Sequence, residues 1–264
     1  MRRPTSWDEP VGPGVWQPVP VERGDAVRTW KARRRTGPGQ AEVLERLAPV
    51  YAVAADRPLD AAAVYGRTAP LVLEIGSGTG EAAAVMAAAD PSRDVLAVEV
   101  HTPGVATLLR RIEQEGLRNV RVAEGDGLQV LADALGPGSL DEVRVFFPDP
   151  WPKARHAKRR LVTPSFAALV ADRLRPGGRL HVATDWAAYA GQVLEVVDAA
   201  PHLQLVSRDR GDRPLTRFER RGLAAGRPAS DVVAVRTRPA GRDTGSGTGD
   251  RAGSSRRTST RGDA

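Results

Sequence analysis

Cysteine is absent from this chain of 264 residues. Without thiols the protein can form no disulfide, no zinc–thiolate site and no cysteine nucleophile. No stretch approaches the ~20 consecutive apolar residues of a membrane helix. The first ten residues carry charge and proline where a signal peptide would have an apolar run. These absences disfavour secreted and membrane proteins, and we expect a cytoplasmic one.

Patterns typical of hydrolases and metalloenzymes are also missing. The chain has no Gly-x-Ser-x-Gly segment, which disfavours the hydrolases that use it. Its four histidines show no metal-ligand spacing, so we expect no metal. They are His101, His156, His181 and His202. We interpret His181, which lies inside a predicted strand, as a core residue.

Charge is distributed unevenly along the chain. The formal net charge is +7. All of this excess lies in residues 1–40 and 237–264, which carry net charges of +4 and +3. Between them, residues 41–150 carry −8 and residues 151–236 carry +8. Such a chain can bind a cation and a polyanion in different places, although charge counts alone fit an ordinary solvated surface equally well.

The two ends differ from the middle in composition. Residues 1–27 are rich in proline and glycine, and residues 238–264 contain no leucine, isoleucine, valine or aromatic side chain. A segment of that kind cannot bury enough apolar surface to fold. We therefore predict one domain over residues 28–237, between a poorly ordered N-terminal tail and a disordered C-terminal tail.

Short apolar runs alternate with helical patterns through this domain. The predicted strands are residues 71–76, 94–100, 120–125, 141–147, 179–184, 203–208 and 231–237. The predicted helices are residues 40–55 (broken by Pro49), 80–89, 103–115, 127–135, 164–174 and 187–199. The last two strands are predicted to be joined by a polar loop without a helix. This order predicts an α/β fold with a doubly wound, Rossmann-like sheet, mostly parallel, that ends in an antiparallel pair. Ligands of such sheets bind at the carboxyl ends of the strands.

The first strand leads into a glycine-rich loop preceded by an acid. Gly76, Gly78 and Gly80 permit a tight turn and a close approach of a ligand to the backbone. Glu74 can pair with a cationic ligand or brace the loop through a hydrogen bond. The loop also suits a nicotinamide-dependent dehydrogenase, but the third glycine comes one residue earlier than Gly-x-Gly-x-x-Gly requires.

Acidic residues also follow the next strands. Glu99 ends the second strand, 19 residues after Gly80, where a carboxylate can accept both hydroxyls of a ribose. Asp126 follows the third strand and can bind an adenine amino group or cap the next helix. Asp149 lies in residues 146–153, where three prolines stiffen a loop that could form a pocket for a flat base.

A basic segment comes next. Its side chains could pair with phosphates, although most charge runs are simply solvated. They are Arg155, His156, Lys158, Arg159 and Arg160. Residues 213–222 add the hydroxyl of Thr216, the ring of Phe218 and the carboxylate of Glu219. A non-catalytic RNA-binding protein, for which only the basic segment matters, is one interpretation of these residues.

Five motifs occur together: LEIGSGTGE, AVEVH, FFPDPWPKARHAKRRL, ATDW and RPLTRFERRG. In this order they resemble the bacterial tRNA (guanine-N7-)-methyltransferase family over residues 28–237. The glycine motif is common to class I S-adenosylmethionine-dependent methyltransferases, whereas the PDPWPKARHAKRR and TRFE segments are specific to the family. The resemblance implies the class I methyltransferase fold, S-adenosyl-L-methionine as cofactor, and methylation of the variable-loop guanine at position 46 of tRNA. A methyltransferase acting on another RNA, a small molecule or a protein remains an alternative.

The resemblance also implies roles for individual residues. Cofactor contacts fall on Glu74, Glu99, Asp126 and Asp149, in addition to the three loop glycines, and Asp149 is also the catalytic residue. Substrate contacts fall on Lys153, Asp185, Thr216, Arg217, Phe218 and Glu219. RNA contacts fall on Arg155, His156, Lys158, Arg159 and Arg160, and residues 28–40 resemble the family's basic arm. The expected partner is tRNA, with no membrane and no metal, and the expected state is a monomer or homodimer.

Overall fold

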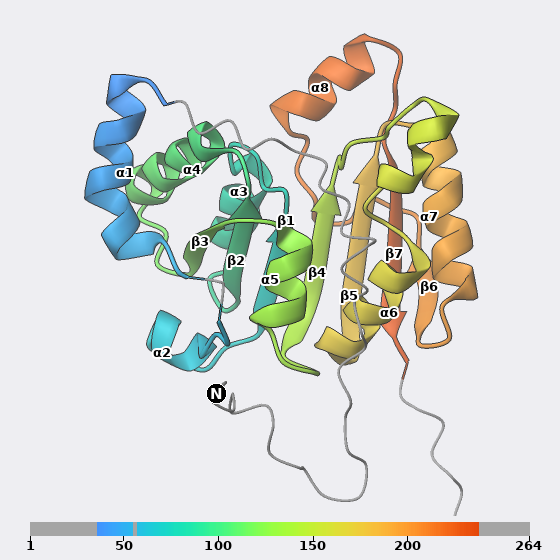
Figure 1. Cartoon of the computed structure of the whole chain (residues 1–264), viewed down its shortest axis with the longest axis horizontal. Coiled ribbons are helices and arrows are strands. Elements are labelled where there is room, and N and C mark those ends of the chain that lie inside the picture. Colours follow the sequence, from blue (N-terminus) through green and yellow to red (C-terminus); the bar gives the residue numbers. More distant parts are fainter. Residues whose placement is uncertain (1–35, 55–56, 238–264) are drawn as a thin grey trace, which may run out of the picture.

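The computed structural model describes residues 36–54 and 57–237. The two predicted tails and most of the predicted basic arm lie outside these residues. One seven-stranded sheet in the order β3-β2-β1-β4-β5-β7-β6 forms the centre of the described part (Figure 1). Its strands are β1 (Leu71–Ile75), β2 (Asp94–Glu99), β3 (Val120–Glu124), β4 (Leu140–Phe146), β5 (Leu174–Thr184), β6 (Leu203–Ser207) and β7 (Ser230–Arg236).

Helices connect the strands and form the outer layers. They are α1 (Pro38–Tyr51), α2 (Ala61–Tyr65), α3 (Glu81–Ala89), α4 (Thr102–Glu115), α5 (Gly127–Asp133), the 3-10 helix η1 (Ala154–Arg159), α6 (Pro164–Arg173), α7 (Ala187–Ala199) and α8 (Arg217–Ala224). None of these described helices is long and apolar enough to cross a membrane.

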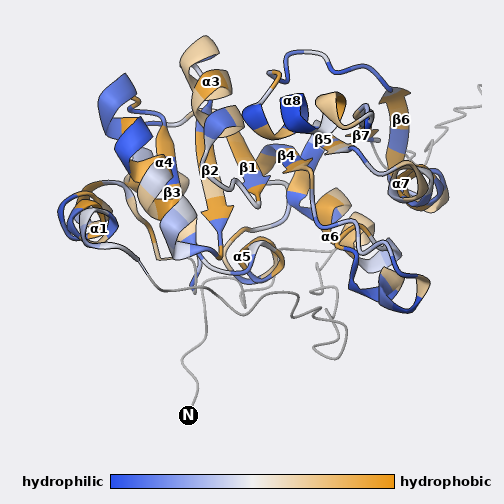
Figure 2. Cartoon of the chain, turned by 90° about the horizontal axis from the view of Figure 1, so that it is seen from above, coloured by the Kyte–Doolittle hydropathy of each residue, from blue (hydrophilic) through white to orange (hydrophobic). Residues whose placement is uncertain are grey.

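The sheet is covered on both faces. Strands β1 to β5 run parallel, and β7 is antiparallel to β5 and β6. Helices α1, α3 and α4 pack on one face, and α5, α6 and α7 on the other (Figures 1 and 2). Every residue of β1 and β2 is buried, as expected for parallel strands between two helical layers. The predicted fold class is confirmed.

The prediction of a helix-free loop between the last two strands was wrong, because α8 lies there. Thr216 caps this helix, and its hydroxyl accepts a hydrogen bond from the backbone N–H of Glu219 over 3.3 Å. The Thr-x-x-Glu spacing is a known start signal for helices. The prediction missed this signal because several side chains of the α8 segment are charged and exposed, as they are in a loop.

Two boundaries also differ from the predictions. Pro49 does not break the first helix, since α1 continues to Tyr51 and a proline so close to a helix end disturbs few hydrogen bonds. Strand β5 begins at Leu174, which pairs with Leu140 of β4 before the register shifts. The glycine-containing segment after the helix is therefore the first part of strand β5 and not a separate turn.

Candidate active site

The glycine loop follows β1 at the point where the strand order reverses, between β1 and β4. Gly76, Gly78 and Gly80 have φ values of 74°, 57° and 73°, which L-residues with a side chain rarely adopt. A Cβ added to Gly76 or Gly78 would meet no atom within 4 Å. On Gly104 of α4, a Cβ would lie 2.6 Å from the carbonyl oxygen of Gly78. Helix α4 thus packs closely against the Gly78 carbonyl group, whereas the space beside the Cα atoms of Gly76 and Gly78 is open and can hold a ligand.

Glu99 fixes this loop. Its Oε2 accepts a hydrogen bond from the backbone N–H of Gly78 over 2.6 Å, and its Oε1 accepts one from His101 over 2.8 Å. The carboxylate therefore joins the glycine loop to the start of α4. Each oxygen keeps a second lone pair, so the ribose contact stays a prediction.

Glu74 is a buried acid on β1. Only 2% of it is exposed, and its Oε2 has no hydrogen-bond partner among the described residues. Burial raises its pKa to about 7, although the charge of Arg144 on the neighbouring strand acts in the opposite direction. No described residue forms a hydrogen bond with this carboxylate, so the structure supplies no evidence for a loop-bracing role. An unpartnered buried acceptor beside an open loop suits a cationic ligand.

Asp126 lies at the start of α5. Its Oδ1 accepts a hydrogen bond from the backbone N–H of Leu128 over 2.9 Å. The helix-capping interpretation is therefore confirmed. The side chain is also exposed, and contact with an adenine amino group stays a prediction.

The loop after β4 carries Asp149 between two strained residues. Phe147 has a φ of 54° and Trp151 a φ of 43°, a region that bulky residues avoid unless the surroundings enforce it. The backbone N–H of Phe147 donates to the carbonyl oxygen of Ala183 over 2.7 Å. Asp149 is exposed. The strained loop therefore presents a carboxylate at the carboxyl end of β4.

The basic segment divides into an outer and an inner part. Arg155, Lys158 and Arg159 are exposed, and His156 is half-buried, whereas Arg160 is only 8% exposed. Arg160 donates through Nε to the carbonyl oxygen of Pro150 and through Nη1 to Oε1 of Gln192, each over 2.8 Å. These contacts hold the loop that contains Asp149 against α7. Arg155 donates to the His156 ring over 3.3 Å, and the guanidinium of Arg159 lies 4.8 Å from the ring centroid of Trp151.

The segment between β6 and β7 is anchored by a buried arginine that we did not identify from the sequence. Arg213 is 1% exposed and hydrogen-bonds to both Asp231 of β7 and Glu219 of α8. Its guanidinium also lies 5.1 Å from the ring centroid of Phe147. Glu219 is 1% exposed and accepts hydrogen bonds from Arg210 as well. The only sequence signal for this anchor was the Thr-x-x-Glu helix start.

Helix α8 and the residues just after it contact the loops that follow three other strands. The backbone N–H of Arg217 donates to Glu81 at the start of α3 over 2.8 Å. The ring of Phe218, 53% exposed, lies 5.0 Å from that of Phe147. Asp185, after β5, pairs with Arg227 over 2.9 Å. The predicted substrate residues Asp185, Thr216, Arg217 and Phe218 are therefore brought together with the Asp149 loop, and Glu219 lies beneath them. Lys153 is exposed beside η1.

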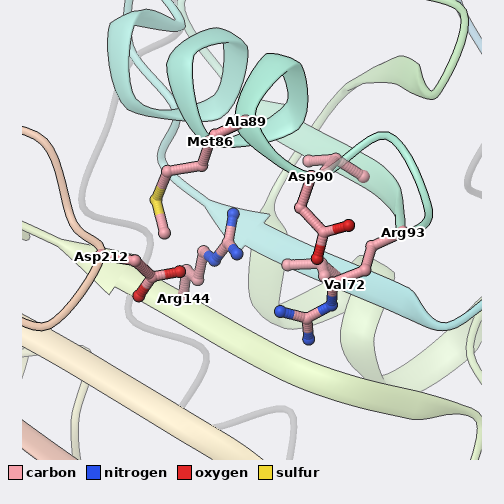
Figure 3. Close-up of a pocket in the computed structure, with 8 residues that line it drawn as sticks. Val72, Met86, Ala89, Asp90, Arg93, Arg144 and Asp212 are labelled. Carbon is pink, nitrogen blue, oxygen red and sulfur yellow. The ribbon is translucent and has the colours of Figure 1, made fainter.

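A cavity of about 240 Å³ lies elsewhere, beneath the segment that precedes α8. Val72, Met86 and Val95 form apolar walls, and Arg144 and Asp212 supply charge (Figure 3). It is lined by the early parts of β1 and β2 and not by their carboxyl ends, so it is separate from the glycine loop. Within the described ranges, no group of three acidic or histidine side chains could hold a metal ion.

The strand order distinguishes between the candidate classes. Dinucleotide-binding domains have the order 3-2-1-4-5-6 with all strands parallel. Here an antiparallel β7 lies between β5 and β6. Together with the glycine loop and the acid that ends β2, this sheet defines a class I methyltransferase.

Comparisons with known proteins identify the family. Residues 68–232 match the family model described as "Putative methyltransferase". The tRNA (guanine-N(7)-)-methyltransferase of Streptomyces avermitilis is 48% identical over 221 residues, covering 81% of this chain and 76% of that protein. The enzyme of the same name from Acidovorax sp. is 46% identical over 225 residues, covering 83% and 90%. The chain belongs to the tRNA (guanine-N(7)-)-methyltransferase family.

A solved structure matches the fold. The crystal structure of the 16S rRNA methyltransferase KamB has a TM-score of 0.50 and 17% sequence identity, covering 69% of this chain and 95% of that one. At this identity the match concerns the fold alone.

Proposed function

We propose that this protein transfers a methyl group from S-adenosylmethionine to N7 of a guanine in tRNA, with the variable-loop guanine at position 46 as its target, and that it acts in the cytoplasm. The observation that carries this proposal is the position of Asp149. This carboxylate lies on a strained loop that contacts α8 through the rings of Phe147 and Phe218. Exposed basic side chains follow it directly along the chain.

The residues around the glycine loop fit the cofactor. The carboxylate of Glu74 and the hydroxyl of Ser77 are both buried and both have an atom without a hydrogen-bond partner in the described structure. The open loop would accept the amino acid part, Glu99 the ribose and Asp126 the adenine. When bound, S-adenosylmethionine supplies an electrophilic methyl group on a cationic sulfur. Glu74 and Asp149 favour a cation in this region because both are carboxylates.

Guanine N7 has a free lone pair at neutral pH, so no proton has to be removed from it. The protein therefore contributes orientation and electrostatic stabilisation more than general-base catalysis. Asp149 would hold the guanine and favour the positive charge that develops on it. Asp185 is the better placed acceptor for the guanine N–H groups, because Arg227 donates to its Oδ2 alone, whereas both carboxylate oxygens of Glu219 already accept hydrogen bonds from arginines. Phe218 offers an exposed ring for stacking.

Methyl transfer itself tests this proposal. With labelled S-adenosylmethionine, we expect label in a tRNA transcript that carries guanine 46 and none in a transcript with adenine at that position. Asp149→Ala should abolish turnover and leave binding of S-adenosylmethionine measurable. Near wild-type methylation by that variant would remove Asp149 from the reaction. Equal labelling of both transcripts would exclude the proposed target.

A further inference from the structure

The exposed surface of α8 is strongly basic. Between Pro214 and Ala229 the only acidic residue is Glu219, and it is buried and paired with arginines. The arginines of the same segment are all exposed. They are Arg217, Arg220, Arg221 and Arg227. The outer face of the helix therefore carries positive charge without compensating negative charge of its own.

The guanidinium groups of two of these arginines form ion pairs within the protein. Arg220 pairs with Glu81 over 3.2 Å, and Arg227 with Asp185 over 2.9 Å. Within the described part of the chain, the guanidinium groups of Arg217 and Arg221 have no acidic partner within the 4.0 Å of an ion pair. The two lie four residues apart and so share one face of the helix.

Helix α8 lies on one side of the active-site mouth, the name we give to the surface around the Asp149 loop at the carboxyl ends of the strands. It is attached through Glu81 to the face of the sheet that carries α3, and Figure 2 shows α8 on that side of the sheet. The segment with η1 is attached to the other face, because Arg160 bonds to Gln192 of α7. The loop with Asp149 lies between these attachments. Basic side chains therefore flank the loop from both faces of the sheet.

We propose that Arg217 and Arg221 form a second phosphate-binding surface for tRNA, on the side of the mouth away from η1, so that the bound RNA spans the mouth and contacts both sides. This inference rests on the proposed function. Guanidinium groups suit the partner, since they bind phosphate oxygens with several donors in a planar group. Both side chains are exposed, and neither forms an ion pair with a described acidic residue, so they are available to a polyanion.

Arg221 provides the cleanest test, because its side chain has no intramolecular pair to lose. For Arg221→Gln we expect about a fivefold weaker affinity for tRNA at 0.15 M salt. The slope of log K against log salt should fall by about one, as for one lost phosphate contact. KM for tRNA should rise in parallel, and Arg221→Glu should show a larger loss of affinity. Arg221→Lys, which keeps the charge, should recover most of it.

Arg118→Gln is the matched control, since Arg118 is also exposed but lies just before the amino end of β3, away from the mouth. It should leave the affinity and the salt slope unchanged, and equal urea midpoints would show that the variants fold. If wild-type protein methylates tRNA and both Arg221→Gln and Arg221→Glu bind it as wild type does, the proposed surface is wrong. That outcome would favour another partner, such as an acidic protein. If wild-type protein itself fails to methylate tRNA, the proposed function fails instead.

Discussion

Arg213 and Asp231 form a buried, two-pronged ion pair, in which Nε donates to Oδ1 over 2.7 Å and Nη2 donates to Oδ2 over 2.8 Å. Burial acts to raise the pKa of Asp231, but the hydrogen bonds from Arg213 and His181 outweigh it and hold the pKa at about 2. The same guanidinium reaches Glu219. One side chain thus attaches α8 to β7, in a segment that covers a cavity and lacks an apolar core of its own.

Replacing Arg213 should therefore destabilise the protein more than most single changes do. In Arg213→Lys a single ammonium nitrogen cannot reproduce the four hydrogen bonds that the planar guanidinium makes to Asp231 and Glu219, so both buried carboxylates lose part of their pairing. We expect a loss of about 3 kcal/mol in the free energy of unfolding, measured by urea denaturation. Arg175→Lys is the control, because the ion pair of Arg175 with Asp141 is exposed on the arginine side and should contribute less than about 1 kcal/mol. An Arg213→Lys variant as stable as the control would contradict the anchoring role.

Glu74 should make the binding of S-adenosylmethionine depend on pH. Its pKa in the folded protein is raised from 4.5 to about 7, so much of it is protonated at pH 6. Binding of a cation favours the carboxylate, and the affinity should rise between pH 6 and pH 7.5. Glu74→Gln should bind more weakly and show little change over this range. Calorimetric titration at several pH values measures both, and a parallel pH dependence in the variant would assign the effect to another group.

The raised pKa also sets the sign of a stability effect. A carboxyl group whose pKa is higher in the folded state stabilises that state while it is protonated. This contribution is complete below about pH 4.5 and is lost as the pH rises through about 7. Glu74→Gln should consequently be more stable than wild type at pH 8 and similar to it at pH 4.5.

Gly104 should tolerate no side chain. A Cβ there would lie 2.6 Å from the carbonyl oxygen of Gly78, so Gly104→Ala must displace the glycine loop or the start of α4. We expect at least a tenfold loss of affinity for S-adenosylmethionine in an equilibrium binding assay. Gly191→Ala is the matched control within α7, where a Cβ meets no atom within 4 Å. It should keep the affinity and gain up to about 1 kcal/mol of stability. Equal affinities in the two variants would show that the loop adapts.

Alanine substitutions of Arg160 and Arg159 should have different effects on kinetics and stability, although the two residues are neighbours in the basic segment. Arg160→Ala removes the donor to the carbonyl oxygen of Pro150, so it should lower kcat and the unfolding midpoint. Arg159→Ala should raise KM for tRNA and lower the unfolding midpoint less than Arg160→Ala does, because the Arg159 side chain is exposed and its described contact is with the surface of the Trp151 ring, 4.8 Å from the centroid. Steady-state kinetics with tRNA as the varied substrate separates the two effects. Identical kinetic changes in both variants would mean that both arginines act only as phosphate ligands.

The sheet and its ligand-binding edge could be predicted from local patterns. The apolar runs and the glycines at Gly76, Gly78 and Gly80 depend on neighbouring residues in the chain, and strand ends in a parallel sheet meet at one edge. Asp126 was predicted either to cap a helix or to bind adenine, and the capping role could be inferred locally because Asp126 directly precedes a predicted helix. Helix α8 escaped detection because its stability comes from contacts distant in sequence and not from an apolar stripe.

What the sequence alone determined was the alternation of strands and helices, and therefore the class of fold and the edge at which ligands bind. Its motifs also indicated the family. Only the tertiary structure decided which polar residues are buried: Arg160 and Glu219 lie in runs that resemble solvated surface, yet each serves a buried pairing. Gln192, the partner of Arg160, lies 32 residues away, and Arg213, the partner of Glu219, is held in place by Asp231 of β7. No local pattern specifies these partners. Hydrogen bonds and ion pairs between distant segments form only when the fold brings those segments together, so the roles of Arg160 and Arg213 could not be predicted from spacing.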